Sequence, residues 1–168
     1  MGQATYNPTA NQTPDATLGG SAVTTPTNLG YANTSLTAVD GENFSASWRG
    51  FSFPAIGGPP QSVTLKVDWS HFGSLTGAGS KNNSHKIEYS VNGGGAWTTL
   101  LNNVGITSSS NGTATATLTL PLDATQLQVR SSLSVTTSVA GTTASVTANI
   151  SQVRIEVVVY DVATVMIL

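Results

Sequence analysis

The acidic and hydroxyl side chains that could bind a metal ion or cleave a bond are few in this sequence. Asp40, Glu42 and Ser45 lie together in the segment SLTAVDGENFSASWRGFSF. A carboxylate and a hydroxyl on one tight loop offer the oxygen ligands that a hard cation such as calcium prefers, so Asp40 and Ser45 are metal candidates. Asp40 and Glu42 are also two carboxylates close in sequence, as a glycosidase pair could be. A solvated Asp-Gly turn explains the same residues, and these interpretations stay open.

The other residue types used in catalysis do not form a recognisable site. His71 and His85 stand on either side of a Gly- and Ser-rich segment, outside any zinc-helix spacing, and the chain has no cysteine to complete a metal site. The serines do not occur in a G-x-S-x-G elbow, and Gly93–Gly95 is a turn rather than a phosphate cradle. We therefore expect no enzyme activity, no catalytic residue and no cofactor.

Aromatic side chains offer one further kind of site, because sugars stack on exposed rings beside polar groups. Trp48, Trp69 and Trp97 occur where the alternating pattern favours the core. The candidates for a carbohydrate contact are instead His71 and Phe72, beside a Gly-rich segment, and Tyr31.

The composition excludes several classes of partner. Only 8% of the 168 residues are charged, and the formal net charge is -2. Nucleic-acid phosphates and anionic membrane surfaces both require dense Lys and Arg, whereas this chain has six, which are scattered. No apolar run reaches the length of about 20 residues that a membrane-spanning helix needs, so membrane insertion is not expected.

Alternating apolar and polar residues predict the elements that must position any site. Val63, Leu65, Val67 and Trp69 share one face, as do Ile87, Tyr89 and Val91. Similar runs follow at 113–120, 126–130, 132–139 and 150–161, and Gly-, Asn-, Ser- and Pro-rich breaks separate them, including 73–84. This pattern predicts an all-β, antiparallel, jelly-roll-like sandwich.

The N-terminal part of the sequence differs from the remainder. Residues 1–35 are rich in Pro, Asn, Thr and Gly, and Asp15 is their only charge. We expect them to form an extended arm with one or two strands at most, for instance at 21–25, and residues 36–168 to form the sandwich domain. No basic and apolar leader opens the chain, so either a secretion signal was removed or the protein leaves its cell by another route.

Two passages resemble known families. The Asp40-Gly41 turn, Ser45 and Trp48, with the late strand ISQVRIEVVVYD, resemble discoidin-like, galactose-binding-like jelly rolls, a group that includes many carbohydrate-binding modules. That resemblance implies a calcium site, but Arg154 stands where many members have an acidic ligand, so we expect no high-affinity site. The chain is also similar to a loose class of phage structural and bacterial surface modules, which share a Thr- and Asn-rich lead and a Y-S-x-N-G-G hairpin.

The segment YSVNGGGAWTTL has the spacing of an Asp-box, Ser-x-Asp-x-Gly-x-x-Trp, with Asn92 in the Asp position. This motif is a β-hairpin whose Asx side chain bonds its own turn. Sialidase propellers repeat it in successive blades, whereas here it occurs once. We therefore expect a structural hairpin.

The C-terminal sequence VATVMIL carries no charge, Gly or Pro. An apolar strand exposed at a sheet edge would aggregate, so it is either a buried strand or one that a neighbouring subunit covers. The assembly candidates are Val162, Val165, Met166, Ile167 and Leu168. The leading hypothesis is a structural or adhesive subunit, homo-oligomeric or assembled with other subunits, in a virion or at a cell surface. The alternative is a carbohydrate-binding module whose partner is a glycan.

Overall fold

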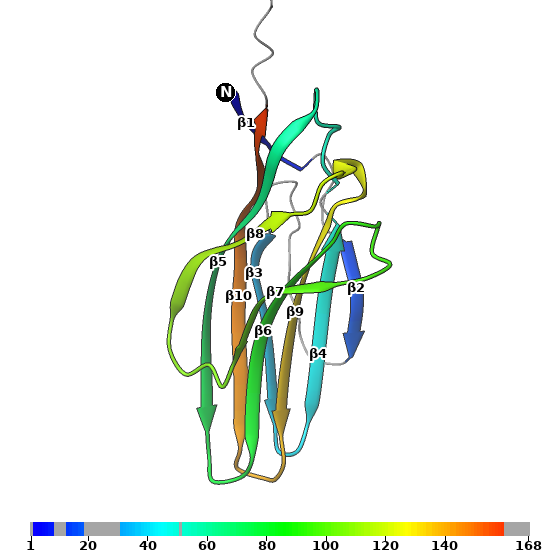
Figure 1. Cartoon of the computed structure of the whole chain (residues 1–168). Coiled ribbons are helices and arrows are strands. Elements are labelled where there is room, and N and C mark those ends of the chain that lie inside the picture. The colour runs from blue at the N-terminus through cyan, green and yellow to red at the C-terminus, as the bar shows by residue number, and fades with distance from the viewer. Residues whose placement is uncertain (1, 9–12, 19–30, 51, 160–168) are drawn as a thin grey trace, which may run out of the picture.

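The computed structural model describes residues 2–8, 13–18, 31–50 and 52–159 (Figure 1). These residues form antiparallel strands and one short 3-10 helical turn, η1, at Ala124–Gln126. The strands are β1 (Gly2–Tyr6), β2 (Thr13–Leu18), β3 (Tyr31–Val39), β4 (Asn43–Gly50), β5 (Pro60–Thr76), β6 (Lys81–Ser90), β7 (Thr98–Val104), β8 (Ser110–Leu118), β9 (Gln128–Thr137) and β10 (Thr143–Val159).

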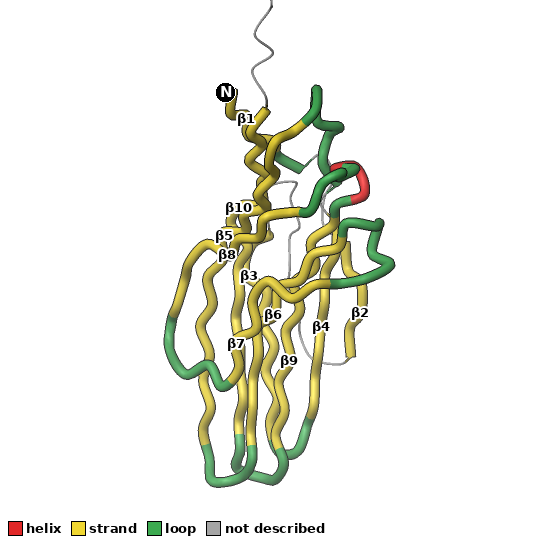
Figure 2. Tube along the Cα trace, in the orientation of Figure 1, coloured by secondary structure: helices red, strands yellow, loops and turns green. Residues whose placement is uncertain are grey.

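Two antiparallel sheets pack face to face. Sheet A has the order β1-β10-β5-β8, and β3 also pairs with β10, next to β1 along that long strand. Sheet B has the order β2-β4-β9-β6-β7. Figure 2 shows strand through most of both layers, with turns joining the strands at their ends. The predicted all-β sandwich is confirmed.

The core follows from the alternation that predicted the strands. Val63, Leu65 and Val67 of β5 are fully buried, as are Ile155 and Val157 of β10. Burying one such side chain contributes about 1.5–3 kcal/mol. The remaining members of this first cluster come from both sheets, among them Ile87, Leu127 and Val129. Trp69 and Tyr89 are partly buried against it, as the pattern predicts.

A second apolar cluster fills the part of the sandwich where β3 pairs with β10. It contains Leu36, Leu133, Val135 and Val146. Buried polar side chains also face the interior from the middle strands of both sheets, namely His71, Asn83, His85 and Ser131. The interior is therefore not uniformly apolar.

The segment 1–35 differs from the expected arm. Among its described residues, β1 pairs with β10 in sheet A, and β2 pairs with β4 in sheet B. β3 begins at Tyr31 and continues across the expected boundary at residue 36. Strand pairing uses main-chain N–H and C=O groups, so a Pro- and Thr-rich segment can form a strand even when its side chains do not alternate between apolar and polar. The expected strand at 21–25 lies outside the described residues.

Two central strands are longer than the sequence predicts. The expected break at 73–84 is strand except for a tight turn, because β5 continues to Thr76 and β6 begins at Lys81. The inward positions here hold His71, Gly73 and Asn83, and these residues hide the apolar alternation. At the other end of β6, Val91 lies beyond the strand and is exposed.

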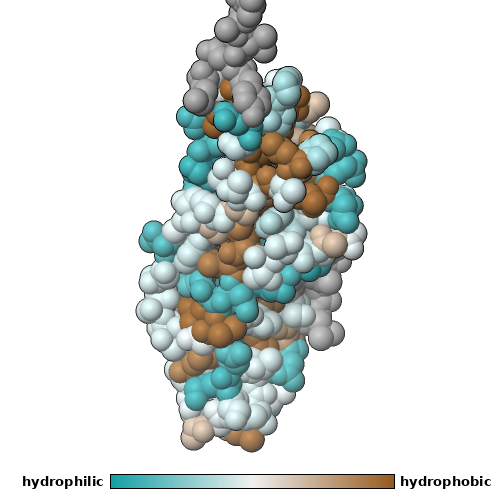
Figure 3. Space-filling view, in the orientation of Figure 1, coloured by the Kyte–Doolittle hydropathy of each residue, from teal (hydrophilic) through white to brown (hydrophobic). Residues whose placement is uncertain are grey.

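The surface reflects the low charge of the chain. In the face shown in Figure 3, most of the surface is pale, the colour of residues of intermediate hydropathy, with smaller brown and teal patches.

Candidate functional site

An exposed aromatic ring borders a hollow on the outer face of sheet A. Phe72 of β5 is 52% exposed, because its neighbours His71 and Gly73 take the inward positions of the strand. The hollow has a volume of about 210 Å³. Its lining consists of Ser70, His71, Phe72, Ser109, Ser110, Asn111, Thr147, Ala148 and Asn149. We call it the Phe72 hollow.

Strand register brings these residues together from three adjacent strands. Ser70 lies opposite Asn111 of β8 on one side and opposite Asn149 of β10 on the other, while Phe72 lies opposite Thr147. Side chains at paired positions share a face of the sheet and approach within about 5.5 Å. The hydroxyl of Thr147 is held by the Ser35 hydroxyl at 2.8 Å. Apart from Ser109, which lies in the β7–β8 connection, the polar residues of the hollow therefore belong to strands of the sheet.

The groups that line the Phe72 hollow are complementary to a neutral, polyhydroxylated ligand. Each Asn amide offers donors and acceptors, and each Ser or Thr hydroxyl offers both. The Phe72 ring provides an apolar face for the C–H groups of a sugar ring. The described lining contains no carboxylate and no Lys or Arg. The described lining therefore offers hydrogen-bonding groups and an apolar ring, with the His71 imidazole as its one titratable side chain.

The three carbohydrate candidates are placed differently by the structure. Phe72 is exposed, as expected. His71 is only 7% exposed, which corrects the expectation that it lies at the surface, because the alternation of β5 turns its side chain inward. The backbone of Tyr31 pairs with Ile150, next to Asn149 in sequence, and its side chain lies outside the described part of the structure.

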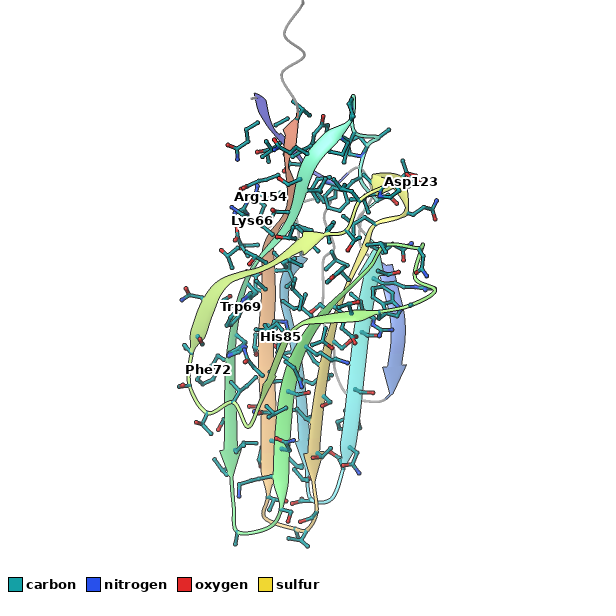
Figure 4. All side chains as sticks on the ribbon, in the orientation of Figure 1. Lys66, Trp69, Phe72, His85, Asp123 and Arg154 are labelled. Carbon is teal, nitrogen blue, oxygen red and sulfur yellow. The ribbon has the colours of Figure 1, made fainter. Side chains whose placement is uncertain are left out.

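His71 belongs instead to an aromatic cluster with Trp69 and His85. Figure 4 labels Trp69 and His85 of this cluster. The Nδ1 atoms of the two histidines lie 3.4 Å apart, and the Ser131 hydroxyl lies 3.3 Å from Nε2 of His85. Burial and the charge of His71 lower the pKa of His85 to about 3, and burial also lowers the pKa of His71. Both rings are therefore neutral at pH 7.

A second hollow lies on the outer face of sheet B and has a volume of about 340 Å³. We call it the serine groove, and it is lined by Ser45, Ser47, Ser84, Lys86, Glu88, Arg130, Ser132, Leu133 and Ser134. Glu88 Oε2 accepts hydrogen bonds from Arg130 Nε at 3.0 Å and Nη2 at 2.7 Å, and Lys86 forms an ion pair with Oε1. Burial alone would raise the pKa of Glu88, but these hydrogen bonds and charges lower it overall.

The two metal candidates have different surroundings. Asp40 adopts a positive φ of 54° in the β3–β4 turn, and its carboxylate accepts a hydrogen bond from the Gly141 N–H at 2.8 Å. Asp40 thus links two neighbouring turns. Ser45 lies in β4 and lines the serine groove. Among the described residues, no group of three or more His, Cys, Asp or Glu side chains could hold a metal ion.

Arg154, the residue that replaces an acidic ligand in the resemblance, is engaged on sheet A. It forms ion pairs with Asp68 and Glu156, and Lys66 also pairs with Glu156 at 2.7 Å. The charges on this face are therefore matched. The expected weakness of a calcium site at Asp40 remains a prediction.

The Asn92 hairpin is confirmed as a structural element. Asn92 Oδ1 accepts hydrogen bonds from the Ser90 hydroxyl at 2.7 Å and from the Ala96 N–H at 2.9 Å. Gly94 has a φ of +94° and donates its N–H to the Ser90 hydroxyl. Trp97 is not a member of either core cluster described above. Its ring lies 4.3 Å from the Arg130 guanidinium carbon, beside the serine groove.

The assembly candidates Val162, Val165, Met166, Ile167 and Leu168 lie outside the described residues. In the part of the chain that the structure describes, no helix has the length and apolar character needed to cross a bilayer.

Sequence reasoning missed the polar partners of Phe72 and the whole of the serine groove. Asn111 and Asn149 are far from Phe72 in sequence and occur among many other Ser, Thr and Asn residues. The alternation of β4, β6 and β9 does indicate which of their residues face outward. It does not indicate which strands are neighbours.

Comparisons with known proteins give distant likenesses. No protein-family model matches the chain, and no curated protein matches it in sequence. Among solved structures, it is similar to the carbohydrate-binding module TmCBM61 in complex with β-1,4-galactotriose, at 15% identity and a TM-score of 0.32, over 74% of this chain and 69% of that one. It is also similar to a CBM4 structure, at 13% identity and a TM-score of 0.32, over 81% and 77% of the two chains.

A third structure, of infectious bursal disease virus strain Gx, is 15% identical with a TM-score of 0.19, and the match covers 75% of this chain and 35% of the viral one. At these levels the likenesses assign neither a family nor a ligand to this chain.

Proposed function

We propose that this protein is a non-catalytic carbohydrate-binding module that binds a neutral glycan at the Phe72 hollow. The observation that carries the proposal is the exposed Phe72 ring at the border of a hollow lined by Ser70, Asn111 and Asn149. An apolar surface with a few placed polar groups is the general form of a small-ligand site. The Phe72 ring provides contact area for a sugar, and the amides and hydroxyls of the lining fix the orientation of that sugar through hydrogen bonds.

A neutral glycan fits this hollow better than an acidic one, because its described lining bears no charge. The proposal is also non-catalytic, since glycoside hydrolysis normally requires two carboxylates flanking the bond and the described lining provides none. A role in glycan binding places the protein outside the cell or at a cell surface.

Binding to a panel of neutral polysaccharides, including β-galactan, β-glucan and xylan, tests the proposal. The glycan that binds is then titrated by calorimetry into Phe72→Ala, which should lose affinity about tenfold, equivalent to about 1.4 kcal/mol, because the stacking surface is gone. Val104→Ala is the matched control, since Val104 is an exposed apolar residue of sheet B. Equal losses in both variants, or no binding to any member of the panel, would contradict the proposal.

A second candidate function is a structural subunit of a virion or surface assembly. The observation that favours it is the uncharged, apolar sequence of residues 162–168, which begins shortly after the end of the long strand β10 at Val159. An apolar segment can pair with a sheet edge of a neighbouring subunit through main-chain hydrogen bonds.

Light scattering on the full chain and on a chain lacking residues 162–168 tests this second function. A subunit of this kind should have a multiple of the monomer mass, and the deletion should return it to the monomer. Deletion of residues 1–30 is not a matched test, because it would remove β1 and β2 from the two sheets. A full-length monomer at high concentration would refute the assembly.

A further inference from the structure

The Phe72 hollow lies where β8 stops pairing with one edge of β5. The pairing of β8 with β5 ends at Ser110, opposite His71, whereas β10 continues along β5 and pairs Thr147 with Phe72. Among the described residues, Phe72 therefore has a paired neighbour on β10 and none on β8. The β7–β8 connection, residues 105–109, joins sheet B to sheet A at this point (Figure 1).

One residue of this connection is buried. The Ile106 side chain is 6% exposed and belongs to the second apolar cluster, whereas residues 105 and 107–109 are exposed. Ile106 lies outside the strands, so its main-chain N–H and C=O groups have no place in a sheet ladder. Buried main-chain groups need hydrogen-bond partners, and the Asn83 side chain of β6, 1% exposed, provides both.

The Asn83 amide takes the place of a neighbouring strand for Ile106. Its Oδ1 accepts a hydrogen bond from the Ile106 N–H at 2.6 Å, and its Nδ2 donates to the Ile106 carbonyl at 2.8 Å. Nδ2 also donates to the carbonyl of Ser145 in β10 at 2.6 Å. One side chain thus joins β6 of sheet B, the β7–β8 connection and β10 of sheet A. An amide can do this because it has an acceptor and two donors, whereas an ionised carboxylate has no donor.

The strand that carries Phe72 leaves room for this anchor. Gly73 follows Phe72 at an inward position. A Cβ atom there would lie 2.5 Å from the Ile106 carbonyl oxygen and 2.6 Å from Asn83 Nδ2. The anchor therefore packs directly against the backbone of the residue next to Phe72, and a side chain at this position would displace it.

We propose that Asn83 is a positioning residue of the Phe72 hollow. By holding Ile106 in the interior, it draws the chain inward just before Ser109 and keeps the connection off the exposed ring of Phe72. It thereby fixes the wall that Ser109 and Ser110 contribute to the hollow. Lining residues that are held in place before a ligand arrives lower the entropic cost of binding. The effect on binding rests on the proposed glycan site, whereas the anchoring of the wall does not.

NMR of the ¹⁵N-labelled protein tests the anchor without a ligand. In Asn83→Ala, the amide of Ile106 should exchange its hydrogen about tenfold faster than in the wild type, because its acceptor is gone. The heteronuclear NOE values of the Ser109 and Ser110 amides should fall, because this wall of the hollow then moves on the nanosecond timescale. Asn92→Ala is the matched control: it also removes hydrogen bonds that close a turn, but at the opposite end of β6. It should leave these NOE values unchanged.

Calorimetry then measures the effect on binding, with whichever of β-galactan, β-glucan and xylan binds the wild type. Asn83→Ala should bind this glycan about tenfold more weakly, and Asn92→Ala should bind it like the wild type. Gly73→Ala is a second variant, which keeps the Asn83 amide but displaces the Ile106 carbonyl, and it should weaken binding in the same way. Its control is Gly57→Ala, because a Cβ atom at Gly57 would meet nothing within 4 Å.

The proposal is overturned if the NOE values of Ser109 and Ser110 stay at their wild-type level in the folded Asn83 and Gly73 variants. It is also overturned if these variants bind the glycan as tightly as their two controls do. Where Asn83→Ala does not fold, Gly73→Ala decides both measurements. If no glycan of the panel binds the wild type, the proposed function fails, and the NOE values alone decide whether Asn83 positions this wall.

Discussion

His85 is a buried ionisable residue that has no acidic partner among the described residues. Its side chain is fully buried, and the groups described around it are the His71 and Trp69 rings and the Ser131 hydroxyl. None of these can neutralise an imidazolium. The cost of burying the charged form keeps the ring neutral, and the nearby His71 adds to that cost.

The protein should therefore lose stability as the pH falls below 6.5. The pKa of His85 is lowered from 6.5 to about 3 on folding, so between these values the unfolded chain binds a proton that the folded chain does not. The free energy of unfolding is therefore at its full value above pH 6.5 as far as His85 is concerned, and it should fall by about 2 kcal/mol by pH 5. Urea unfolding at pH 7.5 and pH 5 measures this loss.

His85→Gln is the control for this prediction, because glutamine can still bond Ser131 but does not titrate. The variant should retain only the smaller pH dependence of His71. The pKa of Glu88 is lowered from its usual value of 4.5, so this carboxyl changes its protonation state below the interval from pH 5 to pH 7.5. If the wild type and His85→Gln lose the same stability between pH 7.5 and pH 5, the account of His85 is wrong.

At the scale of elements, the Asn92 hairpin is the clearest case in which local sequence determines local structure. Its bonds from Asn92 and Ser90 close the turn, and positive φ values at Gly93 and Gly94 allow the chain to reverse. The sequence pattern alone predicts this element because every contact within it is local.

Asn92→Ala should destabilise the protein by about 1–2 kcal/mol, because the Ser90 hydroxyl and the Ala96 N–H both lose their acceptor. Asn92→Asp keeps an oxygen in the same position and should be close to wild type. Chemical denaturation of the three proteins measures the difference. An alanine variant as stable as the aspartate variant would show that these bonds do not hold the turn.

Other elements could be predicted only in part. Val63, Leu65 and Val67 alternate cleanly with polar residues, so their strand and their burial follow from the sequence. The same strand continues through His71 and Gly73, where the inward positions are not apolar and the pattern fails. β1 and β2 have few apolar residues, and they are strands because β10 and β4 offer them partners.

The candidate site was least accessible from the sequence. Exposure of Phe72 could be expected from the Gly-rich segment that follows it. Its position beside Asn111 and Asn149 depends on the register of three strands, which is a tertiary property. The same holds for the residues that line the serine groove, which come from three neighbouring strands.

At the scale of the whole molecule, the two sheets present different surfaces. Sheet A carries matched ion pairs and the Phe72 hollow, whereas sheet B carries the serine groove, in which Lys86 and Arg130 both contact Glu88. The two hollows therefore lie on opposite faces of the sandwich.

The most direct test of the central claim is to map a bound neutral glycan onto the protein by ¹⁵N NMR. The glycan that binds in the polysaccharide panel is titrated into labelled protein, and amide shifts are followed. The account predicts the largest shifts at Ser70, Phe72, Asn111 and Asn149, with little change along β4 and β9. Shifts confined to sheet B, or none at the Phe72 hollow at saturation, would contradict it.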